Sequence, residues 1–259
     1  MSRAAASRVA ERQHSRVVNA ATVSAGRLSI VLPRSGAGDG GAVDEVATLL
    51  QRPVTAPRAL LVLAHGAGAD MHHRSMAAIA DALCVERIAT LRCNFPFKEH
   101  GRPRVDDTDT AVATLEAAVA YAARALPGVP LLLGGHSFGG RMASHAAARG
   151  AVPDIRGLVF CSFPLHTAGK PAVSRAAHLP RIQRPMLFLS GTRDALAAPA
   201  LLAECVAALA PLARLHWLHD ADHSYATRQR ERVGAPDVFV ELAQTVSAWL
   251  EDIDTQPAV

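Results

Sequence analysis

Short apolar segments alternate with longer helical segments from residue 59 onward, and this alternation constrains the fold more than any other feature of the sequence. The apolar segments have the length and composition of buried strands, whereas the segments between them predict helices. The predicted strands are Ala59–Ala64, Arg87–Arg92, Leu131–Gly134, Gly157–Cys161, Met186–Leu189 and Arg214–Leu218, and the predicted helices are Ser75–Cys84, Thr108–Ala125, Gly139–Ala148, Ala200–Leu209 and Val238–Leu250. Such βαβ units predict an α/β fold: a mostly parallel sheet, helices on both faces, and functional residues at the carboxyl ends of the strands.

The length of the chain, 259 residues, suits one α/β domain with a single core. An edge strand is predicted at Arg27–Leu32, and the glycine-rich run Ser35–Ala42 after it favours a loop. We therefore expect one domain over residues 27–254, with its core beginning at Ala59, and a disordered basic tail over residues 1–26. The segment between Ser162 and Met186 is too short for a large folded lid.

The net charge of +4 lies in the first 27 residues. That segment holds one acid, Glu11, against five arginines: Arg3, Arg8, Arg12, Arg16 and Arg27. The rest of the chain has no net charge, so we expect no nucleic-acid partner. No apolar run is long enough to span a membrane as a helix, so we expect a soluble protein without a membrane partner.

The N-terminal segment lacks the continuous apolar stretch of a secretory signal peptide. It is rich in Arg, Ser and Ala and poor in acids, so an organelle transit peptide stays an alternative to a disordered tail. The four cysteines, Cys84, Cys93, Cys161 and Cys205, form no C-x-x-C pair, and the first three lie in apolar surroundings. We expect buried, reduced thiols and a cytoplasmic location.

The motif with the clearest chemistry is Gly135-His136-Ser137-Phe138-Gly139, which matches the G-x-S-x-G pattern of a nucleophile elbow. A predicted buried strand precedes it and a helix rich in small residues follows it, as the elbow requires. Glycines on both sides of the serine leave room for a sharp turn. Ser137 is the candidate nucleophile, although a serine that only caps a helix would show the same local pattern.

A serine hydroxyl needs a base to remove its proton and an acid to orient the base, and in this fold they follow in the order serine, acid, histidine. Asp194 comes directly after a predicted strand and is the candidate acid, with Asp220 and Asp222 as rivals and a helix N-cap as the structural alternative. His223, after the last predicted strand, is the candidate base, and His219 is an alternative base.

An oxyanion hole needs two backbone N–H groups directed at the developing negative charge. Phe138, which follows the nucleophile, supplies the first donor. The loop His65-Gly66-Ala67-Gly68 follows an early strand, so we assign the second donor to Ala67, with Gly68 as the fallback.

Other polar clusters fit no cofactor. Asp70, His72 and His73 lack further residues at metal-ligand spacing, and no phosphate-binding loop motif is present, so we expect neither a metal nor a nucleotide cofactor. Arg141, and a group around the segment Asn94-Phe95-Pro96-Phe97, suit either an anionic substrate group or a solvated surface, with a solvated loop preferred for that group. The group comprises Arg92, Asn94, Lys98 and Arg104.

Six segments in order resemble the α/β-hydrolase superfamily, and within it the dienelactone-hydrolase-like proteins related to testis-expressed protein 30 and the NSL complex subunit 3. They are LAHGAGADM, RCNFPF, GGHSFGGRMAS, FPLHTAGKP, PMLFLSGTRD and DADHSY, between about Leu60 and Tyr225. The resemblance implies Ser137, Asp194 and His223 as the catalytic triad and Ala67 and Phe138 at the oxyanion hole. Serine in place of a nucleophilic cysteine argues against dienelactone itself as substrate.

The sequence thus predicts a serine hydrolase that cleaves a small-molecule carboxylic ester or thioester through an acyl-enzyme on Ser137. Because relatives in this branch serve as subunits of chromatin complexes, the alternative is a non-catalytic interaction module that keeps the fold.

Overall fold

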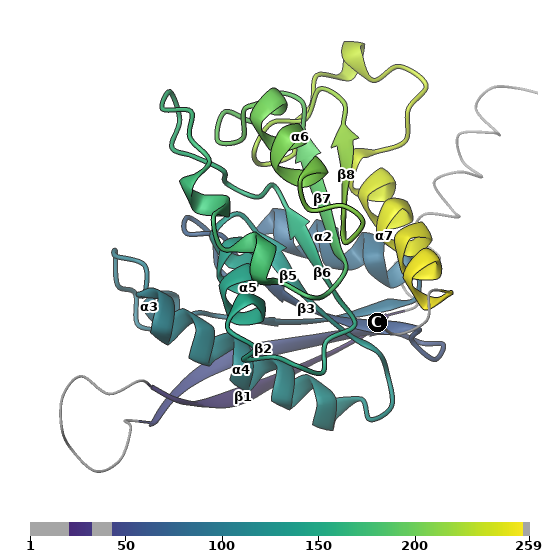
Figure 1. Ribbon diagram of the computed structural model, residues 1–259. Helices are drawn as coiled ribbons and strands as arrows, with labels where there is room; N and C mark the ends of the chain where they lie inside the picture. The colour runs from purple at the N-terminus through teal and green to yellow at the C-terminus, as the bar shows by residue number, and fades with distance from the viewer. Residues whose placement is uncertain (1–20, 33–42, 256–259) are drawn as a thin grey trace, which may run out of the picture.

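A single eight-stranded sheet organises the protein, in the order β1-β2-β4-β3-β5-β6-β7-β8 (Figure 1). The computed structural model describes residues 21–32 and 43–255. The strands are β1 (Ala21–Val31), β2 (Val43–Pro53), β3 (Ala59–Ala64), β4 (Ile88–Cys93), β5 (Leu131–His136), β6 (Gly157–Cys161), β7 (Met186–Gly191) and β8 (Ala213–Leu218). Strands β3 to β8 pair in parallel, whereas β2 pairs antiparallel with both β1 and β4. The predicted α/β fold with a mostly parallel sheet is confirmed.

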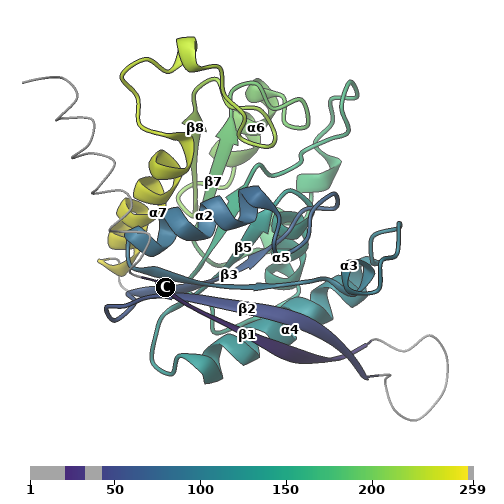
Figure 2. The same cartoon turned by 180° about the vertical axis from the view of Figure 1, so that it is seen from behind.

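Helices cover both faces of the sheet (Figure 2). The helices are α2 (Arg74–Val85), α3 (Pro96–Glu99), α4 (Thr108–Ala125), α5 (Phe138–Ala148), α6 (Pro199–Ala207) and α7 (Val238–Asp254). Buried side chains of α2 and α7 form one apolar cluster with the sheet, and those of α4, α5 and α6 form another. The central strands β3 and β5 are buried over their whole length, because helices enclose them from both sides.

Aspartate side chains cap the N-terminal ends of helices α4 and α7. The Asp107 side chain accepts a hydrogen bond from the N–H of Thr110 at 2.8 Å at the start of α4, and Asp237 does the same for Phe239 at the start of α7. Such caps satisfy backbone donors that have no partner inside the helix. No helix among the described residues has the length and apolar character needed to cross a membrane.

The N-terminal boundary and the start of the core differ from the prediction. Strand β1 begins at Ala21, so residues 21–26 belong to the sheet and not to a tail, and the expected edge strand is longer than Arg27–Leu32. Strand β2 was not predicted, although its alternating pattern buries Val46 and pairs it with Leu28 of β1. The core therefore starts before Ala59. Residues 1–20 and most of the glycine-rich run lie outside the described residues.

The segment between β6 and β7 contains two single-turn 3₁₀ helices, at Ser174–Ala176 and Leu179–Arg181, and no longer element. It runs beside α5 in Figure 1. This agrees with the prediction that no large lid is inserted here.

Candidate active site

Ser137 occupies a sharp turn between β5 and α5. Its backbone has φ 52° and ψ −113°, a conformation that side-chain-bearing residues rarely adopt. The Ser137 N–H donates to the carbonyl of Cys161 in β6 at 2.9 Å, which fixes the turn to the neighbouring strand. A residue held in this region is strained, and such strain concentrates at functional sites.

The turn depends on glycines that allow close backbone contact. A Cβ atom at Gly139 would lie 2.4 Å from the carbonyl oxygen of Ala64, and one at Gly135 would lie at the same distance from that oxygen. Both distances are far below van der Waals contact, so only glycine fits. The G-x-S-x-G pattern therefore reflects the packing of α5 and β5 against the end of β3.

Three side chains from separate loops meet at the carboxyl ends of the strands. The Nε2 atom of His223 lies 2.8 Å from the Ser137 Oγ atom, within hydrogen-bond distance. On the other side of the ring, the His223 Nδ1 atom lies 2.9 Å and 2.8 Å from the two carboxylate oxygens of Asp194. An ionised carboxylate only accepts hydrogen bonds, so Nδ1 carries the proton and Nε2 is left to accept from the serine hydroxyl.

The side chains of this triad differ in burial. The Asp194 side chain is fully buried, whereas that of His223 is 21% exposed. Asp194 follows β7, and its Oδ1 atom also accepts from the N–H of Leu196 at 2.8 Å. The carboxylate is thus held from two sides, whereas part of the imidazole is exposed to solvent.

The loops that carry Asp194 and His223 pack directly against each other. The N–H of Arg193 donates to the carbonyl of Ala221 at 2.9 Å. A Cβ atom at Gly191 would lie 2.2 Å from that same carbonyl oxygen. Glycine at this position lets the acid loop and the base loop approach closely enough for their side chains to bond.

The rival acids are engaged elsewhere. Asp220 is buried and forms ion pairs with Arg228 and Arg193. Its hydrogen bonds with Arg228 hold the pKa of the carboxyl well below its usual range. Asp222 accepts from the N–H groups of Ser224 and Ala226 at 2.8 Å and 2.9 Å, and so shapes the base loop.

The alternative base does not reach the serine. His219 has an exposed side chain at the end of β8, and its carbonyl accepts from Arg232. His216, also on β8, lies 2.9 Å from Glu241 of α7. Of the histidines near the last strand, the structure brings only His223 to Ser137 within the described residues.

His136, the residue before the nucleophile, is a functional candidate that sequence reasoning missed. Its Nε2 atom lies 2.8 Å from the main-chain carbonyl oxygen of His223. A carbonyl only accepts, so this nitrogen must carry a proton. Burial lowers the pKa of His136 to about 4, which keeps the ring neutral near neutral pH. The motif showed a histidine at this position but gave no sign of its partner.

The loop that carries Ala67 lies next to the nucleophile, because a Cβ atom added at Gly66 would lie 3.5 Å from the Ser137 Cβ atom. The N–H groups of Phe138 and Ala67 make no hydrogen bond to any other described residue. His65 holds the base of the Ala67 loop: its Nε2 atom accepts from the N–H of Phe95 at 3.1 Å, and its Nδ1 atom donates to the carbonyl of Gly66 at 2.9 Å. The loop is thereby positioned by a buried, neutral imidazole, whose pKa burial lowers to about 4.

The segment Asn94-Phe95-Pro96-Phe97 is not a solvated loop. Phe95 and Phe97 are 1% exposed, and their rings pack edge-on against Phe138 with centroids 5.3 Å and 6.0 Å apart. The segment leads into the short helix α3, and its two rings support Phe138, the residue after the nucleophile. Two phenylalanines directly after a strand are the sequence signal that could have indicated this supporting role.

Most of the polar groups around that segment serve the fold. Arg92 is buried and donates to the carbonyl of Met71 and to the Gln51 side chain. Asn94 accepts from the N–H of Met71 and donates to Glu99. Lys98 is half-buried above the Phe97 ring, and Arg104 is exposed.

The residues that looked metal-like shape a turn. Asp70 accepts from the N–H of His72 at 2.9 Å, and the His73 side chain caps the start of α2 by accepting from the N–H of Ser75. Of the four cysteines, which are all free, Cys93 and Cys161 are buried, and burial raises the pKa of each to about 12. Cys84 and Cys205 are only half-buried, which corrects the expectation for these two.

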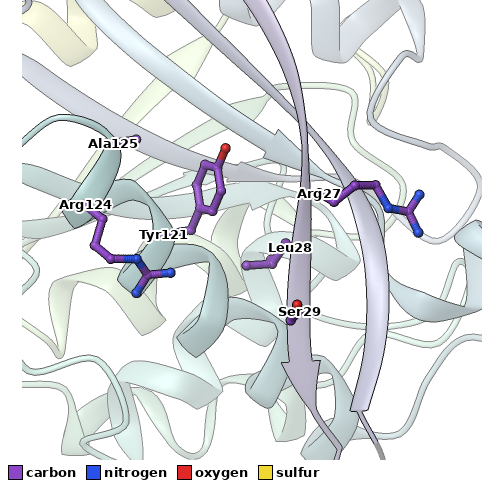
Figure 3. Close-up of a pocket in the computed structure, with 6 residues that line it drawn as sticks. All are labelled: Arg27, Leu28, Ser29, Tyr121, Arg124 and Ala125. Atoms are coloured by element: carbon purple, nitrogen blue, oxygen red, sulfur yellow. The ribbon is translucent and has the colours of Figure 1, made fainter.

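A surface hollow of about 430 Å³ lies away from this site, between β1 and the end of α4 (Figure 3). Its lining residues are Arg27, Leu28, Ser29, Tyr121, Arg124 and Ala125. The Arg27 guanidinium points away from Tyr121 in Figure 3 and donates to Glu99 at 2.8 Å. Strands β2, β4 and β3 separate β1 from the nucleophile-bearing β5 in the sheet.

Comparison with known proteins agrees with the fold. Residues 57–251 match the family model described as "Alpha/beta hydrolase domain". The dienelactone hydrolase of Anabaena variabilis is similar in structure, with a TM-score of 0.66 and 19% identity over 89% of this chain and 98% of that one. Est1E of Butyrivibrio proteoclasticus, solved with ferulic acid bound, gives a TM-score of 0.66 and 17% identity over 82% and 96%. XC6422 of Xanthomonas campestris, described as an α/β serine hydrolase without lid, has a TM-score of 0.62 and 19% identity over 91% of this chain and 96% of that one.

Proposed function

Since the chain belongs to the alpha/beta hydrolase domain family, we propose that it is a serine hydrolase that cleaves carboxylic esters or thioesters with Ser137 as nucleophile. The observation that carries this proposal is the unbroken series of hydrogen bonds from the Ser137 hydroxyl through the His223 ring to the Asp194 carboxylate. The order serine, acid, histidine and the positions after β5, β7 and β8 support it.

In the acylation step, the Ser137 Oγ atom attacks the substrate carbonyl carbon while His223 Nε2 accepts the hydroxyl proton. The carbonyl oxygen becomes an oxyanion, which the N–H groups of Phe138 and Ala67 stabilise. Asp194 holds the imidazole in the productive tautomer and stabilises the imidazolium. When the tetrahedral intermediate collapses, the bond to the alcohol or thiol breaks and His223 returns the proton to this leaving group.

In the deacylation step, water replaces the leaving group and the same groups act in reverse. His223 removes a proton from the water, the resulting hydroxide attacks the acyl carbon, and the second tetrahedral intermediate releases a carboxylic acid. The proton on His223 returns to the Ser137 oxygen. The site regains its starting state without an external oxidant or cofactor.

The finer relationship to testis-expressed protein 30 and the NSL complex subunit 3 remains our proposal, on the six sequence segments that carry it. Members of that branch that act as complex subunits suggest a scaffold role. The side chains at positions 137, 194 and 223 are those of a catalytic triad and bond to one another, which favours catalysis over a scaffold role.

A panel of 4-nitrophenyl esters of increasing acyl length, with acetyl thioesters beside it, tests the proposal. We expect hydrolysis by the wild-type protein and loss of it in Ser137→Ala. Ser162→Ala is the matched control, because Ser162 also follows a strand with φ 52°, but its buried Oγ atom has no hydrogen-bond partner among the described residues. Hydrolysis that persists in Ser137→Ala, or that is absent for all substrates in the wild type, would contradict the proposal.

A further inference from the structure

We propose that Arg141 and Arg175 form a subsite for an anionic group, a carboxylate or a phosphate, on the substrate that Ser137 attacks. The inference rests on the proposed hydrolase function and adds a substrate class to it. It is carried by a cluster of cationic side chains next to the nucleophile that has no acidic partner in the described structure.

Arg141 lies one helical turn after the nucleophile. Its N–H donates to the carbonyl of Ser137 at 3.0 Å in the first turn of α5. The side chain is half-buried, yet its guanidinium makes no hydrogen bond or ion pair with any described residue. Burial and the charge of Arg175 lower the pKa of Arg141.

Arg175 lies on the segment between β6 and β7, in the 3₁₀ helix Ser174–Ala176. Its Nη1 atom donates to the carbonyl of His166 at 3.0 Å. The N–H of His166 in turn donates to the carbonyl of Leu196, whose own N–H donates to Asp194. Arg175 is thus linked to the acid loop through His166 and Leu196. Its segment also packs on α5, where the His178 ring bonds to the Ser144 hydroxyl at 2.7 Å.

The segment between β6 and β7 itself contains no acidic residue. From Ser162 to Arg193 the sequence contains no Asp or Glu, and its cations are Lys170, Arg175, Arg181, Arg184 and Arg193. His145 and His178 stack beside this cluster with ring centroids 3.7 Å apart. Burial, His145, Arg181 and Arg141 lower the pKa of His178 to about 4, as expected in a region of positive potential.

Three other partly buried arginines pair with acidic side chains. Arg58 pairs with Glu251, Arg156 with Asp254 and Arg232 with Glu241. Holding two like charges close together and away from water is unfavourable unless a counter-charge arrives. Uncompensated cations of this kind beside a nucleophile are typical of a binding site for an anion.

The planar guanidinium group selects the ligand chemistry. It binds carboxylates and phosphates through paired hydrogen bonds, which a neutral substrate group cannot accept as strongly. The anion has two sources: a carboxylate on the acyl part of the ester, or a phosphate on the leaving group. Both predict the same dependence on Arg141.

Matched substrate pairs test the subsite and separate the two sources. Mono-4-nitrophenyl glutarate is compared with neutral 4-nitrophenyl valerate, and acetyl-coenzyme A with neutral acetyl-N-acetylcysteamine. For each pair, kcat/KM of the anionic substrate is divided by kcat/KM of the neutral one. We expect Arg141→Gln to lower this ratio at least about tenfold for one pair, because a charge-assisted hydrogen bond is lost. Arg175→Gln should have the same effect. Arg141→Lys, which keeps the charge, should recover part of the ratio.

Arg124→Gln is the matched control. Arg124 lines the hollow between β1 and the end of α4, away from the nucleophile, so its replacement should leave both ratios unchanged. Calorimetric titration of Ser137→Ala with glutarate and with inorganic phosphate tests the subsite without turnover, so that a failed hydrolase assignment does not hide the result. Binding of either anion that Arg141→Gln weakens supports the subsite. Equal effects of Arg141→Gln on both members of each pair, together with no anion binding to Ser137→Ala, would overturn it.

Discussion

His136 donates a hydrogen bond from Nε2 to the main-chain carbonyl of His223 at 2.8 Å. The two rings also lie against each other, with centroids 5.2 Å apart. The residue next to the nucleophile in sequence therefore holds the backbone of the residue that acts as its base, and couples the two loops of the site.

Replacing His136 tests this positioning role. His136→Phe fills the space but removes the donor, so the base loop loses its anchor and we expect kcat to fall by about 10- to 100-fold with little change in KM. His136→Gln places an amide donor in a similar position and should restore much of kcat. Steady-state kinetics on a 4-nitrophenyl ester measures both. If the two variants lose kcat equally while remaining folded, the hydrogen bond has no role in positioning.

The acid can be identified by comparing two aspartates. Asp194→Asn leaves the shape of the site intact but favours the wrong tautomer of His223, so we expect kcat to fall by about three to four orders of magnitude. Asp220→Asn weakens the ion pairs with Arg193 and Arg228 and should affect thermal stability more than kcat. The reverse order of effects on kcat would assign the acid role to Asp220.

The lowered pKa values of two buried histidines predict how the free energy of unfolding depends on pH. Burial lowers the pKa of His65 and of His136 to about 4, below the value of about 6.5 that applies in the unfolded chain. Between these pKa values the unfolded chain binds protons that the folded protein does not. The contribution of the two histidines to the free energy of unfolding is therefore complete above about pH 6.5 and is lost as the pH falls toward about 4. Each histidine should remove about 2 kcal/mol from the free energy of unfolding between about pH 6.5 and pH 5.

Urea unfolding of the wild type and of His136→Gln at these two pH values measures that contribution. The variant has one titrating group fewer and should lose about 2 kcal/mol less than the wild type over the same interval. An equal loss in both proteins would show that His136 is not held neutral by burial.

Gly191 sets the contact between the acid loop and the base loop. A Cβ atom there would lie 2.2 Å from the carbonyl oxygen of Ala221, so we expect Gly191→Ala to destabilise the protein by about 2 to 3 kcal/mol through overpacking. Gly68→Ala is the control, because no atom lies within 4 Å of a Cβ added at that position, and its stability should stay within about 0.5 kcal/mol of the wild type. Chemical denaturation compares them. Equal stability of both variants would contradict the close contact.

The sequence predicted the elements whose signals are local. Strand β3 and helix α4 agree with the prediction residue for residue, because a fully apolar run and a capped amphipathic segment need no knowledge of their neighbours. Ser137, Asp194 and His223 were chosen from their positions after strands, and the structure brings them together. The alternating pattern of β2 was overlooked, because β2 follows the glycine-rich run and has polar residues on its exposed side.

The missed features depend on contacts between distant parts of the chain. His136 and His223 are 87 residues apart, so neither position indicates the hydrogen bond between them. Phe95 and Phe97 are buried because Phe138 packs on them, which a reading of their own segment as a loop did not show. The packing of the segment between β6 and β7 against α5 likewise follows from the path of the chain and not from its local pattern.

The most direct test of the account is covalent labelling of Ser137 by a fluorophosphonate, with the modified peptide identified by mass spectrometry and the labelling rate measured in His223→Ala. We predict one labelled peptide, which contains Ser137, and a rate that falls by orders of magnitude in the variant because the base is removed. Labelling at another residue, or an unchanged rate in His223→Ala, would contradict the claim that these two side chains act as nucleophile and base.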